Sequence, residues 1–225
     1  MIFRRFYWFI LFLLISCSYA DERLSFKYFA KYRPKDSFQI NETIAITPFQ
    51  DLRGNKIKEN SNYNLLPLVL WTNFETDRPE HSFLVLIFRP REDIPKAIQE
   101  EFQSRGIFKD ILMTERKNPV KSEYYIEGKI ISTNRKGKRF SYGLSFLSIY
   151  AFGLGLPKRL SVDEISIELI LIESKTKRHL LKKEYKKNTE YSYTLEKSYN
   201  IMANELIPEI VEECITVIKN AKGLK

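Results

Sequence analysis

The side chains that could carry out chemistry are few and lie far apart in this sequence. Two histidines, His81 and His179, and two cysteines, Cys17 and Cys214, are too widely spaced for a local metal site. Patterns typical of catalytic or phosphate-binding sites, such as Gly-x-Ser-x-Gly, Cys-x-x-Cys and His-Glu-x-x-His, do not occur. Adjacent carboxylates such as Glu212-Glu213 point apart on a helix, so they do not form an acid–base pair. The sequence therefore predicts a protein that is not an enzyme and uses no metal or other cofactor.

The amino-terminal segment has the layout of an export signal, and it ends in one of the two cysteines. Arg4-Arg5 precede the apolar run 6–15, whose ten residues span about 15 Å as a helix, half of a bilayer core. Residues 14–17, Leu-Ile-Ser-Cys, resemble the lipobox of bacterial lipoproteins, in which the cysteine is acylated and becomes the first mature residue. Cys17 is therefore the candidate lipid attachment site. Cleavage after Ala20, at an ordinary small-x-small site, is the alternative.

Composition and charge favour a folded domain that meets a membrane rather than nucleic acid. The chain has 225 residues, 44% hydrophobic and 29% charged, with a formal net charge of +9, which excludes collagenous, disordered and disulfide-rich classes. Basic residues gather in two runs, 135–139 and 182–187, which we interpret as a hairpin tip and the solvated side of a strand. Attraction to an anionic membrane surface is the functional alternative. An exported protein is not expected to bind nucleic acid.

Apolar runs, several of them alternating with polar residues, predict strands along the chain. These strands cover residues 43–49, 83–88, 107–113, 124–133, 140–146, 165–171 and 180–185. The polar segment 50–62 is predicted to be a loop. The apolar segment 63–74 contains Pro67, so we expect an edge strand or an extended cover there rather than a central strand.

Two helices are predicted from spacing and capping residues. The first runs from Asp93, which can cap a helix, to Gly106, where a left-handed cap is expected. The second occupies the carboxyl end, where apolar residues recur every three or four positions from Leu195 to Val217. Pro208 lies inside this second helix and predicts a kink or a break just before it.

These elements predict an α+β fold: a mixed or mostly antiparallel sheet packed by a central short helix and a C-terminal helix, after a signal peptide. The expected organisation is a lipoprotein signal peptide over residues 1–16, a tether over 17–41 and a single α+β domain over 42–221.

The order of the elements and three short motifs resemble a group of bacterial envelope lipoproteins. The motifs of that group are Pro-Phe-x-Asp, Ser-Gly-x-Phe and Asp-Tyr-x-x-x-Gly. Here residues 48–51 match the first, residues 104–108 (Ser-Arg-Gly-Ile-Phe) match the second loosely, and residues 123–128 match the third with Glu in place of Asp. The αβ plan is that of the curli secretion lipoprotein, the lipoprotein activators of penicillin-binding proteins and the amino-terminal domain of the periplasmic Tol propeller protein. The resemblance covers about residues 42–220. It implies a non-catalytic binding or assembly module in the cell envelope.

The residues of these motifs have structural roles in our interpretation. The set comprises Pro48, Phe49, Asp51, Arg53, Gly106 and Gly128. Asp51 and Arg53 can pair across a loop or cap a helix end, and Gly128 permits close packing against a neighbouring strand. Direct contact with a partner is the alternative role.

The segment 144–156 is unusually apolar, because Ser145 and Ser148 are its only polar side chains. It is too short for a transmembrane helix. Two interpretations remain open: a buried strand followed by a Gly-rich turn, or an apolar surface that faces lipid or a partner. In the second case the contact residues are Phe146, Tyr150, Phe152 and Leu154.

The functional hypothesis follows from the signal, the resemblance and the missing catalytic motifs. We expect a non-enzymatic lipoprotein of the bacterial envelope, held by its N-terminal acyl chains, on the periplasmic face or the surface of the outer membrane. It would bind an envelope protein as an auxiliary in transport, secretion or cell-wall assembly. A surface-exposed adhesin that binds host or matrix ligands is the alternative.

Overall fold

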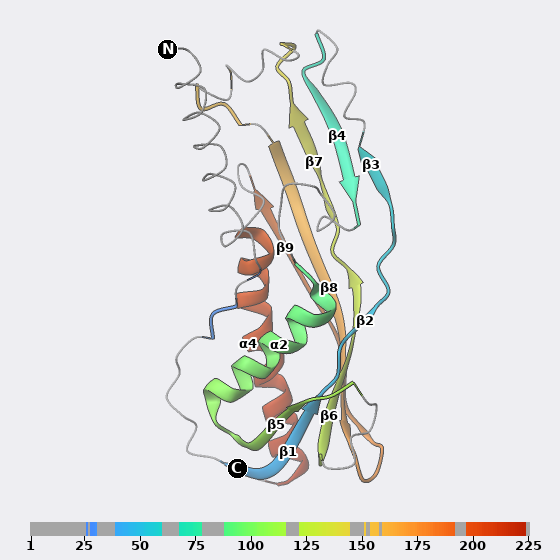
Figure 1. The fold of residues 1–225 in the computed structure, drawn as a ribbon, viewed down its shortest axis with the longest axis vertical. Helices are drawn as coiled ribbons and strands as arrows, with labels where there is room; N and C mark the ends of the chain where they lie inside the picture. The colour runs from blue at the N-terminus through green and yellow to red at the C-terminus, as the bar shows by residue number, and fades with distance from the viewer. Residues whose placement is uncertain are drawn as a thin grey trace, which may run out of the picture.

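The computed structural model describes residues 26, 28–30, 39–59, 68–77, 88–115, 122–144, 151, 154–157, 159–191 and 197–223. They fold into one mixed sheet with a short central helix and a long C-terminal helix on one of its faces (Figure 1). The predicted α+β fold class is therefore confirmed. The predictions for residues 1–25, which include the signal peptide and Cys17, lie outside the described residues.

The sheet contains nine strands among the described residues. They are β1 (Ile40–Ile46), β2 (Gln50–Asp51), β3 (Ile57–Glu59), β4 (Trp71–Thr76), β5 (Phe108–Met113), β6 (Tyr124–Ser132), β7 (Arg135–Phe140), β8 (Arg159–Glu173) and β9 (His179–Tyr191). Their order is β3-β4-β7-β8-β6-β1-β5, with β2 beside β6 and β9 beside β8. β1 runs parallel to β5 and β6, β2 runs parallel to β6, and the other pairs are antiparallel.

β8 pairs with three other strands, and this pairing corrects the prediction that residues 135–139 form a hairpin tip. Along one edge it pairs with β7 through its first residues and with β6 through its last, while β9 follows the other edge. The basic run 135–139 is therefore part of β7 inside the sheet and not a hairpin tip. Its central Gly137 approaches β8 so closely that a Cβ atom there would lie 2.0 Å from the carbonyl oxygen of Leu160. Glycine is needed at this position because there is no room for a side chain, and not because the chain turns there.

The helices α2 (Pro90–Arg105) and α4 (Lys197–Ala221) cover one face of the sheet (Figure 1). The main core between them and the sheet includes the buried side chains of Ile44, Ile46, Ile126, Ile130, Ile167, Leu169, Ile94, Ile98, Phe102, Leu206 and Ile210. Alternation along the strands sends the neighbouring residues to the opposite face, which we call the open face. Ala45, Tyr125, Ile170 and Ile172 form a small separate apolar cluster there.

α2 begins earlier than the sequence suggests. Its first residue is Pro90, and the Asp93 carboxylate accepts a hydrogen bond from the backbone N–H of Arg89 at 2.6 Å. Pro95 therefore lies inside the helix. Gly106 ends the helix in the left-handed region, with φ 62° and ψ 29°.

α4 continues through Pro208, so the predicted break does not occur. A proline removes one N–H donor from a helix, and burial of the surrounding apolar face compensates for that loss. Leu206, Ile207 and Ile210 are all fully buried in the main core. None of the helices in the described part of the chain is long and apolar enough to cross a membrane.

Other differences from the sequence prediction are local. The segment 50–62 contains the short strands β2 and β3, so its described part is not only a loop. The strand expected over 140–146 ends at Phe140, because Tyr142 and Gly143 turn the chain with φ of 55° and 72°. The described part of the segment 63–74 supplies β4, which has neighbours on both sides.

Part of the range predicted as a tether packs against the helices. The ring of Phe26 lies 5.0 Å from that of Phe88, which in turn stacks on Tyr199 of α4. The Tyr28 hydroxyl donates a hydrogen bond to Glu101 of α2 at 2.8 Å. These contacts hold the segment that follows the expected export signal against both helices.

Candidate functional site

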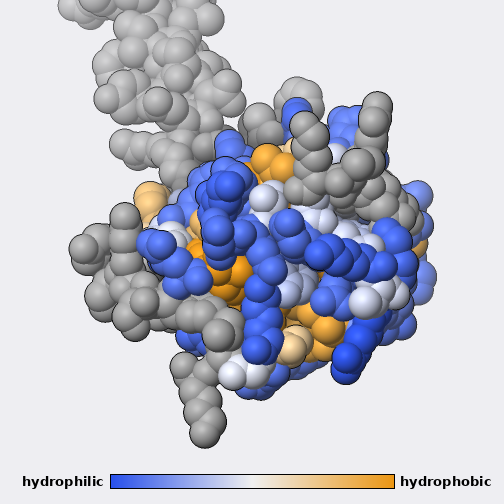
Figure 2. Space-filling view, turned by 90° about the horizontal axis from the view of Figure 1, so that it is seen from below, coloured by the Kyte–Doolittle hydropathy of each residue, from blue (hydrophilic) through white to orange (hydrophobic). Residues whose placement is uncertain are grey.

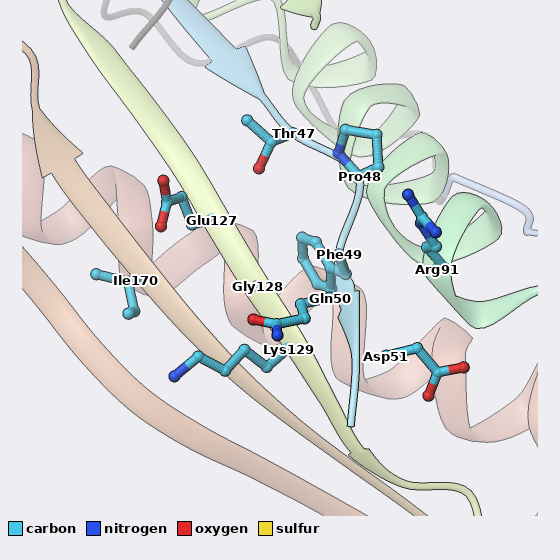
Figure 3. Close-up of a pocket in the computed structure, with 10 residues that line it drawn as sticks. All are labelled: Thr47, Pro48, Phe49, Gln50, Asp51, Arg91, Glu127, Gly128, Lys129 and Ile170. Carbon is cyan, nitrogen blue, oxygen red and sulfur yellow. The ribbon is translucent and has the colours of Figure 1, made fainter. Parts of the chain in front are cut away.

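A pocket of ≈ 450 Å³ opens where the chain crosses from β1 to β2 beside β6 (Figure 3). It is lined by Thr47, Pro48, Phe49, Gln50, Asp51, Arg91, Glu127, Gly128, Lys129 and Ile170. Thr47 is the last residue bound to β6 before the crossing, since its N–H and its hydroxyl both donate to the Ile126 carbonyl at 3.1 Å. Pro48 has no N–H to continue the ladder, so the pairing of β1 with β6 does not extend past Thr47.

The floor of the pocket is a contact between two of the sequence motifs. A Cβ atom on Gly128 would lie 2.4 Å from Cε2 of the Phe49 ring, and Phe49 is completely buried. Only glycine fits beneath this ring. The fold thus brings the Pro-Phe-x-Asp and Tyr-x-x-x-Gly motifs into direct packing contact.

A second proline positions the crossing segment from the side of α2. Pro95 cannot donate a hydrogen bond to the carbonyl of Arg91, four residues earlier in the helix. That carbonyl accepts the N–H of Phe49 instead, at 3.1 Å. The proline inside α2 therefore supplies the acceptor that ties the helix to the segment between β1 and β2.

Two of the charged groups of the pocket, Asp51 and Lys129, form ion pairs. Arg53 makes a two-pronged contact with Asp51, with both N–O distances at 2.9 Å, and also donates to the Thr133 hydroxyl at 2.8 Å. Lys129 contacts Glu168 on the open face at 2.6 Å. The hydrogen bond from Lys129 and the charges of Lys129 and Lys182 lower the pKa of the Glu168 carboxyl, against a smaller opposing effect of burial. These two pairs link the crossing segment and β6 to neighbouring parts of the fold.

The lysines of the basic run 182–187 contact carboxylates as well, and so does Arg135 of the run 135–139. Four lysines of β9 each contact a carboxylate: Lys182 with Glu168, Lys183 with Glu213, Lys186 with Glu164, and Lys187 with Glu205, at 2.6–3.8 Å. In β7, buried Arg135 contacts Asp163 through two hydrogen bonds of 2.6 and 2.7 Å. The described residues also contain no group of three or more His, Cys, Asp or Glu side chains that could hold a metal ion.

A different kind of surface lies at the end of the sheet where β4 and β8 begin and β7 ends, at the top of Figure 1. We call residues 68–74, 138–144, 154–157 and 159–161 the apolar tip. Seven of the fourteen large apolar side chains that are exposed in the described part of the chain belong to it. They are Leu68, Leu70, Trp71, Leu144, Leu154, Leu156 and Leu160. The opposite end, seen in Figure 2, presents mostly hydrophilic side chains.

Backbone hydrogen bonds hold the loops of the apolar tip together. The N–H groups of Ser141 and Tyr142 donate to the Leu70 carbonyl at 2.9 and 3.0 Å, and that of Leu68 donates to Gly143 at 3.2 Å. The Tyr142 hydroxyl donates to the carbonyl of Pro157 at 2.6 Å. The exposed leucines therefore lie on loops that are held in place by hydrogen bonds.

The charge of the apolar tip is of one sign. Its residues include Lys138, Arg139 and Arg159 but no Asp or Glu. The Lys138 ammonium lies 5.2 Å from the centre of the Trp71 ring, and the Arg159 guanidinium lies 4.7 Å from that of Phe74. Both cations therefore lie over aromatic rings of β4.

The structure places only some of the predicted contact residues. Leu154 lies in the apolar tip with 85% of its surface exposed. Phe146, Tyr150 and Phe152 lie outside the described residues. Sequence reasoning missed the part of the tip that includes Leu68 and Trp71, although the apolar run around Pro67 was a signal for it.

Comparison with known proteins identifies similar folds but does not identify the function. No family model matches the chain, and no curated protein matches it. Among solved structures, protein XCC0632 from Xanthomonas campestris, described by the family model DUF330, aligns with a TM-score of 0.55 and 9% identity over 88% of this chain and 98% of that one. This likeness shows a shared α+β fold.

Two further solved structures are similar at a lower level. The PelC dodecamer from Paraburkholderia phytofirmans gives a TM-score of 0.43 at 9% identity, covering 81% of this chain and 92% of that one. Lipoprotein GNA1162 from Neisseria meningitidis gives 0.28 at 13% identity, covering 80% and 99%. Neither similarity is high enough to support an argument about this protein.

Proposed function

We propose that the protein is a non-enzymatic lipoprotein of the bacterial envelope, anchored through acyl chains on Cys17. In this proposal its α+β domain acts as a binding or assembly auxiliary in transport, secretion or cell-wall assembly. The observation that carries the envelope assignment is the apolar tip, because an ordered cluster of exposed leucines is typical of a surface that contacts a membrane or another protein.

The position of the first packed residue supports a short anchor. Cys17 and Phe26 are nine positions apart, so the chain between them spans at most about 30 Å. A domain held by Phe26 and Tyr28 against its helices therefore stays near the membrane surface. Two or more acyl chains anchor a protein far more firmly than one, so the association should survive high salt.

Fatty-acid labelling in cells tests the anchor. We expect wild-type protein to incorporate an alkyne fatty-acid probe and to sediment with membranes. The Cys17→Ser variant should remain unlabelled and either be released or accumulate as an uncleaved precursor. Wild-type protein without label would contradict the lipoprotein assignment.

The auxiliary role is tested by photo-cross-linking in intact cells from positions outside the apolar tip. Suitable exposed positions are Leu52 after β2, Leu112 on β5 and Ile201 on α4. A single envelope protein captured in stoichiometric amount from one of these positions would support the role. Capture of nothing from any of them, together with cleavage of the protein by external protease, would favour the adhesin alternative.

A further inference from the structure

We propose that the apolar tip docks onto an anionic bilayer surface, with Leu68 and Leu154 entering the interface and Lys138 and Arg159 at the level of the lipid phosphates. This inference deepens the proposed function and rests on it, because the anchor brings the tip to the membrane. It names lipid, rather than a protein groove, as the occupant of this surface.

The shape of the tip favours lipid. Leu68 and Leu154 expose 87% and 85% of their surfaces, the largest values among the exposed apolar residues of the described chain. Side chains that protrude this far can enter the interfacial layer of a bilayer without a matching cavity. A protein interface instead buries its main contact residues at the centre of a complementary surface.

The charge pattern of the tip favours anionic lipid. It carries three basic residues and no acidic residue, whereas the rest of the described surface mixes both signs. The Lys138 ammonium lies 5.2 Å from the centre of the Trp71 ring, so the indole can enter the interface while the ammonium stays at the level of the phosphates. Trp, Leu and basic residues together are typical of membrane–water interfaces.

Because the anchor is short, the apolar tip can dock onto the membrane even if its own affinity for lipid is low. β8 alone has 15 residues and is about 50 Å long, whereas the nine positions from Cys17 to Phe26 span at most about 30 Å. Tyr199, which Phe26 approaches through Phe88, lies in the first turn of α4, the end of that helix nearer the apolar tip (Figure 1). Tethering at this distance converts docking into an intramolecular step with a high effective concentration of membrane.

Trp71 provides a direct test, since the only other tryptophan, Trp8, lies in the signal peptide. We would reconstitute the mature acylated protein in phosphatidylcholine vesicles with or without phosphatidylglycerol, using lipids with brominated or ordinary chains. In anionic vesicles we expect the Trp71 emission to move to shorter wavelength and to be quenched by the brominated chains. Raising the salt concentration or omitting phosphatidylglycerol should reduce the quenching.

Matched variants separate docking from general effects of mutation. Lys138→Gln should lower the ratio of docked to undocked protein about fivefold, and Leu154→Asp should abolish quenching. The controls are Leu112→Asp and Lys175→Gln, which change exposed residues on β5 and in the β8–β9 turn. Both should match the wild type. Circular dichroism would verify that every variant is folded.

Each result bears on the proposal separately from the anchor. Unquenched Trp71 in anionic vesicles, for protein that carries its acyl chains, would overturn membrane docking while leaving the lipoprotein assignment intact. If a photo-cross-linker at Leu154 then captured an envelope protein in cells, the tip would belong to a protein partner instead. Equal quenching in the wild type, Lys138→Gln and Leu154→Asp would also overturn the proposal, because the anchor alone would explain it.

Discussion

The ring of Phe49 fills the space that any side chain at residue 128 would need. Three ring carbons would lie 2.4–2.5 Å from a Cβ atom placed on Gly128, far inside van der Waals contact. Phe49 belongs to the segment between β1 and β2, and Gly128 to the centre of β6. This contact fixes the crossing segment on the sheet and makes the two motifs one structural unit.

Gly128→Ala should destabilise the domain clearly. The buried ring must move or β6 must shift, and overpacking of this kind costs about 1–3 kcal/mol of unfolding free energy. Denaturant unfolding followed by circular dichroism measures the change. Phe49→Leu provides the control, since the smaller side chain makes room: in the double variant the added cost of Gly128→Ala should be much smaller. Equal costs in both backgrounds would contradict the role of this contact.

The two motifs illustrate what the sequence could predict and what it could not. Pro48 marks the end of a strand locally, and the repeat of apolar residues in β8 and α4 is visible within a few turns of each element. The contact of Phe49 with Gly128 depends on the register between β2 and β6, which no local pattern specifies. The run around Gly137 suggested a turn because glycine and lysine are common in turns, yet its pairing with β4 and β8 places it inside the sheet.

The apolar tip also depends on strand pairing that no local sequence pattern specifies. Trp71 pairs with Phe140, and Arg139 with Arg159, so three distant parts of the chain meet at one end of the sheet. Each part alone is a short apolar segment that is equally compatible with a core. Their shared exposure arises only from the order β4-β7-β8 and is not visible in any one of them.

Leu206→Ala on α4 should lower the stability by about 2–5 kcal/mol, because Leu206 is fully buried in the main core. Ile201→Ala on the same helix is the matched control. Ile201 is 43% exposed, so its truncation leaves no comparable cavity. Thermal unfolding of the two variants should show a clear shift for the first and a small one for the second. Similar shifts would contradict the packing of α4 described above.

The open face should contribute a pH-dependent stabilisation through Glu168. Contact with Lys129 at 2.6 Å holds the pKa of this carboxyl below its ordinary value of 4.5. A carboxyl whose pKa is lower in the folded state stabilises the fold above its unfolded pKa, and the contribution disappears as the pH falls through the folded pKa. The wild type should therefore exceed Glu168→Gln by about 0.2–1 kcal/mol at neutral pH, the range for partly exposed pairs.

That difference should shrink as unfolding is measured below pH 4.5. Lys129→Met serves as the control for its cause: with the ammonium removed, Glu168→Gln should have a smaller effect at neutral pH. A difference between the wild type and Glu168→Gln that stayed constant from neutral to acidic pH would show that the contact with Lys129 is not its source.

Cys214 should be unreactive in the folded protein. Its side chain is fully buried in α4, and burial, with a smaller effect of the Glu213 charge, raises the pKa of the thiol well above its ordinary value. Thiol reagents attack through the thiolate, so both access and ionisation oppose the reaction. Native protein should therefore react with Ellman's reagent only as fast as it unfolds, and at once in guanidinium chloride. Lys175→Cys, in the exposed β8–β9 turn, should add one thiol that reacts immediately and shows that the reagent is active. Rapid reaction of Cys214 in the native wild type, or a disulfide-linked dimer on a non-reducing gel, would contradict its place in the core.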